Sequence, residues 1–524
     1  MAKKLNKKEL DKSLLLIFQS SIFISIGIIF SKIFAYFYRV IIARYFGPEV
    51  YGVFSLSIMI LSWVTALATL GLIEGLLRFV PVYHGKKDMN RMRYIIKVVA
   101  VFLFFSSIVA AVLLYSLSGF ISSEIFHNPE MVLFLKIFSI AIPFYLFFYF
   151  FLAIIQAFQR IKVHTFLIDF LDNLIPLALI LLFIVMGLKT SAIIFSYALG
   201  FVIVSILSFL YCKYKISEVF KEYSLEEKSK KEVTKKLFSY SWPLILSNVL
   251  YMIFPYIDSF TIGYFKGAFQ VGIYNAAMPI AALLILSPTL FTRLFFPMVT
   301  KEFSRNNLKM IRELSKQTEK WILIVNLPIF LLIFLFPGAI INILFGPEYI
   351  SSTLTIFGKS YIASELALRF LAIGFLFYSL SVLLYNLLSM VGKTKLFLIN
   401  IVSTSLLNLV LNILLIPQYD IAGAAFATMI SQILLCIIVF FQAKKYTSII
   451  PLRRKMLGII FSGAVASILL FFIKGFFKIN LKTIILLSSV FVLVYFVLIL
   501  LTRSLDEKDI MIIKSMKLKY KNGK

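Results

Sequence analysis

The sequence is poor in the residues that most catalytic and metal sites require. It has two cysteines, Cys212 and Cys436, and three histidines, and their spacing fits neither a disulfide framework nor a metal-ligand set. It also lacks a phosphate-cradling glycine loop and a nucleophile constellation. The sequence therefore predicts a protein that is not an enzyme and that uses no cofactor and no metal.

Charge is scarce as well, since only 15% of the residues are charged, whereas 61% are hydrophobic. Apolar runs of about 20 residues, each long enough to cross the hydrocarbon layer, recur along the chain with the charges between them. This pattern predicts an all-α polytopic membrane protein with about fourteen transmembrane helices. The spans are expected near 14–43, 52–80, 94–117, 131–156, 165–187, 190–211, 238–265, 271–299, 321–345, 363–391, 396–416, 420–441, 456–473 and 483–501.

The net charge of +29 reflects the placement of the basic residues and predicts no nucleic-acid partner. Most of the 53 Lys and Arg residues lie in the two tails and in the loops that follow even-numbered spans. This bias predicts a plasma-membrane protein with both termini in the cytoplasm, in contact with membrane lipids. The opposite loops hold only Arg44, Lys189, Lys266, Lys359, Lys474, Lys478 and Lys482.

A short repeat indicates how the helices are organised. Tyr45-Phe46 followed by Gly52-Val-Phe recurs, with one residue inserted, as Tyr264-Phe265 followed by Gly272-Ile-Tyr. Six helices separate the copies, so the repeat is parallel and predicts two pseudo-symmetric six-helix lobes plus two C-terminal helices. The expected domains are an N-lobe at 1–212, a cytoplasmic linker at 213–237, a C-lobe at 238–443, and helices 13–14 with a basic tail at 444–524.

Short motifs recur in order along helices 1 to 12. They are Arg44-Tyr-Phe-Gly-Pro-Glu-Val-Tyr-Gly52, Phe296-Pro-Met, Leu344-Phe-Gly-Pro-Glu-Tyr349, Gly392-Lys-Thr-Lys395, Asn408-Leu-Val-Leu-Asn412, Ile416-Pro417 and Ile421-Ala-Gly-Ala-Ala425. By their order and spacing they resemble the polysaccharide-transporter branch of the multidrug/oligosaccharidyl-lipid/polysaccharide (MOP) exporter superfamily, the flippases of lipid-linked oligosaccharides. Asp420 departs from the family pattern, because glycine is expected before the last motif.

The resemblance implies two lobes around a central cavity that opens to alternate sides of the membrane. Its implied substrate is a polyprenyl-(pyro)phosphate-linked glycan, flipped from the cytoplasmic to the outer leaflet. No ATP-binding motif is present, so the expected driving force is an ion gradient with Na⁺ or H⁺ as the coupling ion, the membrane potential or downstream consumption. A monomer is expected. The alternatives are a lipid II-type peptidoglycan precursor flippase and a drug or cation antiporter of the same superfamily. A membrane glycosyltransferase is a third alternative, which the short outer loops disfavour.

Charged residues inside the spans are the candidate site residues, because a charge at the centre of a membrane helix costs about 2.5–3.5 kcal/mol. Lys32 and Arg39 are seven residues apart and share one face of helix 1. Arginine and lysine bind phosphate through charge-assisted hydrogen bonds, so the predicted phosphate and glycan contacts are cationic. They are Lys32, Arg39, Arg78, Arg293 and Arg369.

Acidic residues inside the spans are the candidates for ion coupling or ion pairing, namely Asp258, Glu74 and Glu365. Glu74–Arg78 and Glu365–Arg369 are each four residues apart, which permits local ion pairs. The repeat aligns Arg39 with Asp258 and predicts that the two interact across the cavity in one conformation. It aligns Lys32 with the uncharged Tyr251, so Lys32 is the first candidate for the phosphate contact.

A second basic segment, Lys301 to Lys320, is predicted to lie along the inner membrane surface because it is amphipathic.

Overall fold

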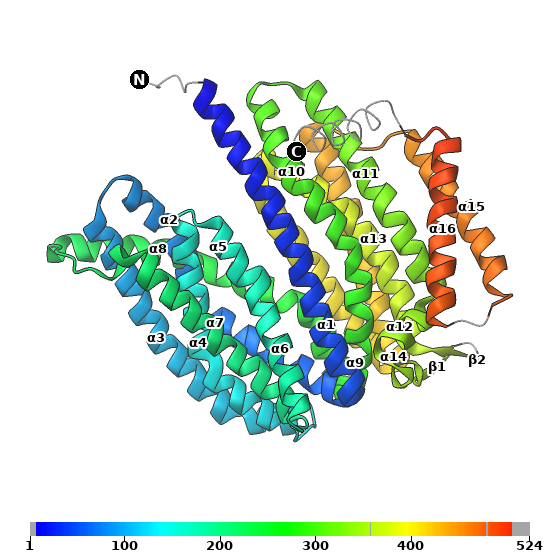
Figure 1. Cartoon of the computed structure of the whole chain (residues 1–524), viewed down its shortest axis with the longest axis horizontal. Helices are drawn as coiled ribbons and strands as arrows, with labels where there is room; N and C mark the ends of the chain where they lie inside the picture. The colour runs from blue at the N-terminus through cyan, green and yellow to red at the C-terminus, as the bar shows by residue number, and fades with distance from the viewer. Residues whose placement is uncertain (1–6, 357, 478–479, 506–524) are drawn as a thin grey trace. The chain divides into compact units, whose positions relative to one another are not determined.

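The protein is described here by a computed structural model, which describes residues 7–356, 358–477 and 480–505. Nearly all of its regular structure is helical, as predicted (Figure 1). Lys478 and the basic tail beyond Leu505 lie outside the described residues. The elements are α1 (Lys7–Ala68), α2 (Leu72–Gly85), α3 (Met89–Phe120), η1 (Ile121–Ile125), α4 (Met131–Ala157), α5 (Ile161–Thr165), η2 (Phe166–Leu171), α6 (Asp172–Val185), α7 (Ser191–Lys215), η3 (Ser217–Phe220), α8 (Glu227–Ile253), η4 (Phe254–Tyr256), α9 (Ile257–Ala281), η5 (Ala282–Ile285), α10 (Leu286–Ser304), α11 (Leu308–Leu335), α12 (Pro337–Phe345), η6 (Pro347–Ile350), β1 (Thr353–Ile356), β2 (Lys359–Ile362), α13 (Ala363–Met390), α14 (Thr394–Thr447), α15 (Lys455–Lys474) and α16 (Leu481–Leu501).

Eleven helical stretches of the described chain are long and apolar enough to cross a membrane. Three of them contain a residue with non-helical backbone angles and therefore consist of two helices each. The breaks lie at Gly47 in α1, Gly267 in α9 and Asp420 in α14. Counting each broken stretch as two spans gives the fourteen that the sequence predicts.

The first two breaks have almost the same backbone conformation. Gly47 has φ 81° and ψ 173°, and Gly267 has φ 81° and ψ −179°. A positive φ with an extended ψ is accessible to glycine at little cost, whereas a Cβ atom is strained there. The two halves of the predicted repeat thus turn by the same device, 220 residues apart along the chain.

The third break places a non-glycine residue in a conformation that favours glycine. Asp420 has φ 51° and ψ −144°, and its carboxylate accepts a hydrogen bond from the Ile421 amide at 2.9 Å. This local bond satisfies an amide at the start of the next helix. The backbone angles of this position therefore explain why the motif leads one to expect glycine where this chain has Asp420.

Asp420→Gly is accordingly expected to stabilise the protein by about 1 kcal/mol, because backbone strain at such a residue costs roughly 1–3 kcal/mol and part of it is offset by the lost amide bond. The measurement is the thermal midpoint in detergent, followed by size-exclusion chromatography after heating. Asp420→Ala, which keeps the strain and loses the bond, should lower the midpoint. If both variants lower it equally, the hydrogen bond outweighs the strain.

The described chain forms two compact units, Met1–Asn275 and Ala276–Lys524. This division falls inside α9, and the predicted lobe and linker boundaries remain a prediction. In the first unit, α4 packs against both α3 and α7, and Figure 1 shows these three helices side by side. The rings of Phe54 on α1, Phe138 on α4 and Tyr197 on α7 pack together, with centroids 5.3–6.5 Å apart.

The two glycine turns contact each other within the first unit. A Cβ atom on Gly52 would overlap the Ala268 carbonyl oxygen, and a Cβ atom on Gly272 would overlap the Pro48 carbonyl oxygen. The contact is reciprocal, because Gly272 is the repeat counterpart of Gly52 and Ala268 that of Pro48, each 220 positions along the chain. Small residues let membrane helices approach until their backbones touch, as they do here.

In the second unit, α13 and both halves of α14 pack together, and α11 packs against α13 and α15. A buried apolar cluster joins α11 to α15 and α16, with Phe491 and Tyr495 at its centre. Gly463 allows the close approach of α15, since a Cβ there would lie 2.7 Å from the Leu327 side chain. The strands β1 and β2 pair antiparallel before α13, a small addition to the predicted all-α fold.

The segment 301–320 does not lie along a membrane surface over its whole length. Helix α11 begins at Leu308, and residues Ser315 and Gln317 to Lys320 are all buried. The amphipathic pattern predicted a segment at the membrane surface, whereas the polar groups in its last turns are enclosed by protein: the Arg453 guanidinium donates to Gln317 at 2.6 Å. The thiols of Cys212 and Cys436 are free and buried.

Candidate functional site

Helix α1 is positioned by one face that packs against η2, α6 and α7. Gly27 lies against Thr165 and Asp169, where a Cβ would be 2.6 Å from the threonine methyl. Four residues further on, the Ser31 hydroxyl accepts a hydrogen bond from the Asn173 amide at 3.1 Å.

The same face continues along the helix. The rings of Phe34 and Phe170 have centroids 5.3 Å apart, and the buried Tyr38 hydroxyl bonds Ser196 at 3.0 Å. Residues 27, 31, 34 and 38 have the three- and four-residue spacing of one helix face. This stripe therefore packs α1 against the rest of the first unit, and the packing determines which side chains of α1 stay exposed.

Lys32 and Arg39 lie on a different face of α1, and both are exposed within the described structure. At about 100° per residue they point in nearly the same direction, some 120–140° from the packed stripe. Lys32 lies within electrostatic range of Arg39 and of Asp169 on η2. The geometry thus places two cations on the open side of α1, with one carboxylate beside them.

Asp258, at the start of α9, is buried, and its hydrogen-bond partner lies in the second half of the same broken helix. Its carboxylate accepts a hydrogen bond from the Tyr274 hydroxyl at 2.5 Å. The side-chain amide of the neighbouring Asn275 donates to the Ser259 hydroxyl at 3.1 Å. The main-chain carbonyl of Asn275 accepts from the Tyr51 hydroxyl at 3.2 Å. In the part of the chain that the structure describes, no ion pair joins Arg39 to Asp258, so their predicted contact remains a proposal for another conformation.

Arg78 does not pair with Glu74, although the two are one helical turn apart on α2. Its guanidinium carbon lies 4.1 Å from the centroid of the Tyr240 ring on α8, which indicates a cation–π contact. Glu74 has a buried carboxylate oxygen that lacks a hydrogen-bond partner among the described residues. The local ion pair permitted by the spacing is therefore not formed.

Removing the Tyr240 ring is expected to separate α2 from α8. Tyr240→Leu should lower the stability by about 1 kcal/mol, the size of a partly exposed cation–π contact. Tyr240→Phe keeps the ring and should leave the thermal midpoint unchanged. A midpoint that falls equally in both variants would assign the effect to the hydroxyl group instead.

Glu365 and Arg369 do form the predicted local pair on α13, with a nitrogen–oxygen distance of 3.6 Å. Arg369 also donates to the Phe334 carbonyl at the end of α11, at 3.3 Å. The Glu365 carboxylate occupies the space beside Gly338, where a Cβ would overlap it. These two charges hold α11, α12 and α13 together, which is a structural role.

Lys474 is a further cation at the C-terminal end of α11, which the sequence analysis placed in a loop and did not select as a site residue. Its ammonium donates to the Leu335 carbonyl at 3.5 Å and lies 4.6 Å from the centroid of the Phe471 ring. Arg293, the remaining predicted cation, is half-buried on α10 in the second unit. The five predicted cations thus divide between the units, with Lys32, Arg39 and Arg78 in the first and Arg293 and Arg369 in the second.

Comparison with known proteins identifies the family. The sequence pattern described as polysaccharide biosynthesis protein matches residues 17–303, more than half of the chain. The chain belongs to the polysaccharide biosynthesis protein family. The pattern of the MatE family matches residues 243–414.

Two relatives are similar to this chain over most of their own length. A membrane protein of Methanocaldococcus jannaschii is 24% identical over 84% of this chain and 86% of its own length. A protein of Shigella flexneri assigned as an O-antigen transporter is 22% identical over 75% of this chain and 89% of its own. A Haloferax volcanii protein assigned as a low-salt glycan biosynthesis flippase is 26% identical over 47% of this chain and 47% of its own.

Solved structures confirm the fold. The lipid II flippase MurJ in its inward closed conformation matches with a TM-score of 0.67 and 18% identity, over 91% of this chain and 98% of that protein. The all-α polytopic architecture predicted from the sequence is therefore correct.

Proposed function

We propose that this polysaccharide biosynthesis protein moves a polyprenyl-phosphate- or pyrophosphate-linked oligosaccharide from the cytoplasmic to the outer leaflet by alternating access. The observation that carries the proposal is the exposed pair Lys32 and Arg39 on the open side of α1. A phosphate that crosses a low-dielectric layer loses its hydration, and these cations replace it with charge-assisted hydrogen bonds.

The proposal includes the setting in which this flippase works. It is a plasma-membrane monomer with cytoplasmic termini, coupled to Na⁺ or H⁺, and Asp258 and Glu74 are the first-unit candidates for the coupling site. Glu365 pairs with Arg369, and Arg369 also donates to the Phe334 carbonyl, which favours a structural role for both residues. Arg78 and Arg293 remain proposed substrate contacts.

The test reconstitutes the purified protein in liposomes and measures the translocation of lipid-linked oligosaccharide. Lys32→Ala combined with Arg39→Ala should lower the rate at least about tenfold, as the loss of a hydrogen bond to a charged group implies. Lys228→Ala combined with Lys231→Ala removes the same charge from exposed residues of α8 and should leave the rate unchanged. Equal rates in both double variants would overturn the cationic mechanism.

Two other substrates distinguish the alternatives. Lipid II, offered in the same liposomes, tests the peptidoglycan precursor flippase. A cationic dye tests the drug antiporter, which the MatE match at 243–414 brings into consideration. Faster transport of either one than of lipid-linked oligosaccharide would replace the proposed substrate.

A further inference from the structure

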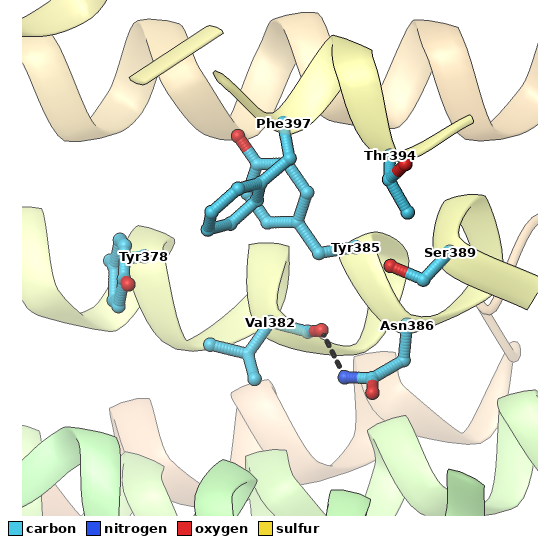
Figure 2. Close-up of a pocket in the computed structure, with 7 residues that line it drawn as sticks. All are labelled: Tyr378, Val382, Tyr385, Asn386, Ser389, Thr394 and Phe397. Atoms are coloured by element: carbon cyan, nitrogen blue, oxygen red, sulfur yellow. Dashed lines mark hydrogen bonds between the residues drawn. The ribbon is translucent and has the colours of Figure 1, made fainter. Parts of the chain in front are cut away.

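A cavity of 320 Å³ lies between the end of α13 and the start of α14, entirely within the second unit (Figure 2). This volume is at the lower end of the range for small-molecule sites, which is about 300–1,000 Å³. Its lining residues all belong to the second unit, whereas the cations of α1 belong to the first. Its lining residues are Tyr378, Val382, Tyr385, Asn386, Ser389, Thr394 and Phe397.

Aromatic rings form part of the wall. Tyr385 of α13 and Phe397 of α14 have centroids 4.7 Å apart at an interplanar angle of 79°, and Figure 2 shows the two rings together. Tyr378 lies two turns before Tyr385, so both rings come from one face of α13. Such a wall offers aromatic faces to the apolar side of a ligand.

Polar groups lie between the rings. The Asn386 amide nitrogen donates to the Val382 carbonyl at 2.7 Å, as Figure 2 shows, which fixes the amide and leaves its oxygen as an acceptor. The hydroxyls of Ser389 and Thr394 have no hydrogen-bond partner among the described residues.

Tyr385 gives the cavity a fixed aromatic wall. Its side chain is only 8% exposed, and its hydroxyl lies beside the Asn400 side chain of α14. The ring is therefore held in place between the two helices, with one face available to the cavity.

Two lysines lie at the edge of this cavity. Lys393 and Lys395 flank the lining residue Thr394, and both are exposed. Lys393 is oriented by the Tyr446 ring, whose centroid is 5.0 Å from its ammonium. The predicted topology puts this turn on the cytoplasmic side, where the lipid-linked substrate is loaded.

We propose that this cavity binds one sugar ring of the phosphate-linked glycan at the cytoplasmic end of α13 and α14. The inference rests on the proposed function and adds a second, sugar-selective contact to it. The carbon–hydrogen face of a pyranose packs on Tyr378, Tyr385 or Phe397, while its hydroxyls bond Asn386, Ser389 and Thr394. Lys393 and Lys395 are placed to meet the phosphate that follows the sugar.

Saturation-transfer NMR on the full chain in nanodiscs tests the proposal without requiring transport. The probes are the methyl glycosides of a hexose and of an N-acetylhexosamine, which carry no phosphate, and dodecyl phosphate, which carries no sugar. We expect transfer to at least one glycoside in the wild type. Ser389→Leu and Asn386→Leu, which fill the cavity, should weaken binding at least about tenfold, as the loss of one or two hydrogen bonds implies.

Ser403→Leu, on the exposed surface of α14, is the matched control and should bind as the wild type does. Equal transfer in the filled and control variants would overturn the proposal, as would binding of dodecyl phosphate but of neither glycoside. Lys32→Ala combined with Arg39→Ala should lower translocation at least about tenfold and preserve glycoside binding. Glycoside binding therefore tests the cavity by itself. If only the filled variants lose it, the sugar site is supported even when the phosphate mechanism of α1 fails.

Discussion

Replacing either Gly52 or Gly272 with alanine is expected to reduce translocation to less than a tenth of the wild-type rate. The added Cβ atom overlaps a carbonyl oxygen of the opposite turn, at Ala268 or Pro48 respectively. A backbone oxygen cannot swing aside as a flexible side chain does, so the two helices must separate. Overpacking of this kind costs typically about 1–3 kcal/mol, and 1.4 kcal/mol is a factor of ten in an equilibrium.

Both glycines belong to one reciprocal contact, which makes the double variant informative. Once the first methyl group has separated the turns, the second meets less resistance, so the effects should be less than additive. Translocation in liposomes and the thermal midpoint in detergent are the measurements. Gly119→Ala is the matched control, because nothing lies within 4 Å of a Cβ there. Fully additive losses would indicate two independent sites.

Reversing the charge at position 32 is expected to have the other large effect. Lys32→Glu should lower the translocation rate by about 100-fold, because it removes a charge-assisted bond of about 1.5–3 kcal/mol and repels the phosphate. It also places a second carboxylate near Asp169. Lys32→Arg keeps the charge and should retain most of the rate.

The ranking of the two cations checks this assignment. Arg39→Ala should slow translocation less than Lys32→Ala, since Arg39 is closer to the end of its span and to the outer interface. Lys228→Glu, on exposed α8, controls for the change of charge. A rate for Lys32→Glu that matches Lys228→Glu would remove Lys32 from the substrate path.

The number and placement of the spans could be predicted because each apolar run must satisfy its own backbone in lipid, whatever its neighbours are. The pairing of Gly52 with Gly272 could be predicted as a repeat, whereas the turns at Gly47 and Gly267 are seen only in their backbone angles. Asp420 was recognised as atypical, and its positive φ accounts for this. Local chemistry therefore carried the prediction of the fold.

The partners of the charged side chains depend on tertiary packing and were predicted less well. A spacing of four residues permits an ion pair in both Glu74–Arg78 and Glu365–Arg369, yet only the second pair forms. Helix α8 offers Arg78 an aromatic ring instead, and nothing in the sequence near position 78 reveals Tyr240. Likewise, the burial of Glu319 and Lys320 follows from helices that enclose α11, which its own amphipathic pattern conceals.

The burial of both native thiols has a practical consequence. Cys212 and Cys436 are the only cysteines of the chain, and neither presents its sulfur at the surface. Thiolate chemistry requires access by the reagent, so a maleimide or nitroxide should react with a newly introduced surface cysteine first. Spin labels or fluorophores can therefore report distances during the transport cycle in an otherwise native sequence.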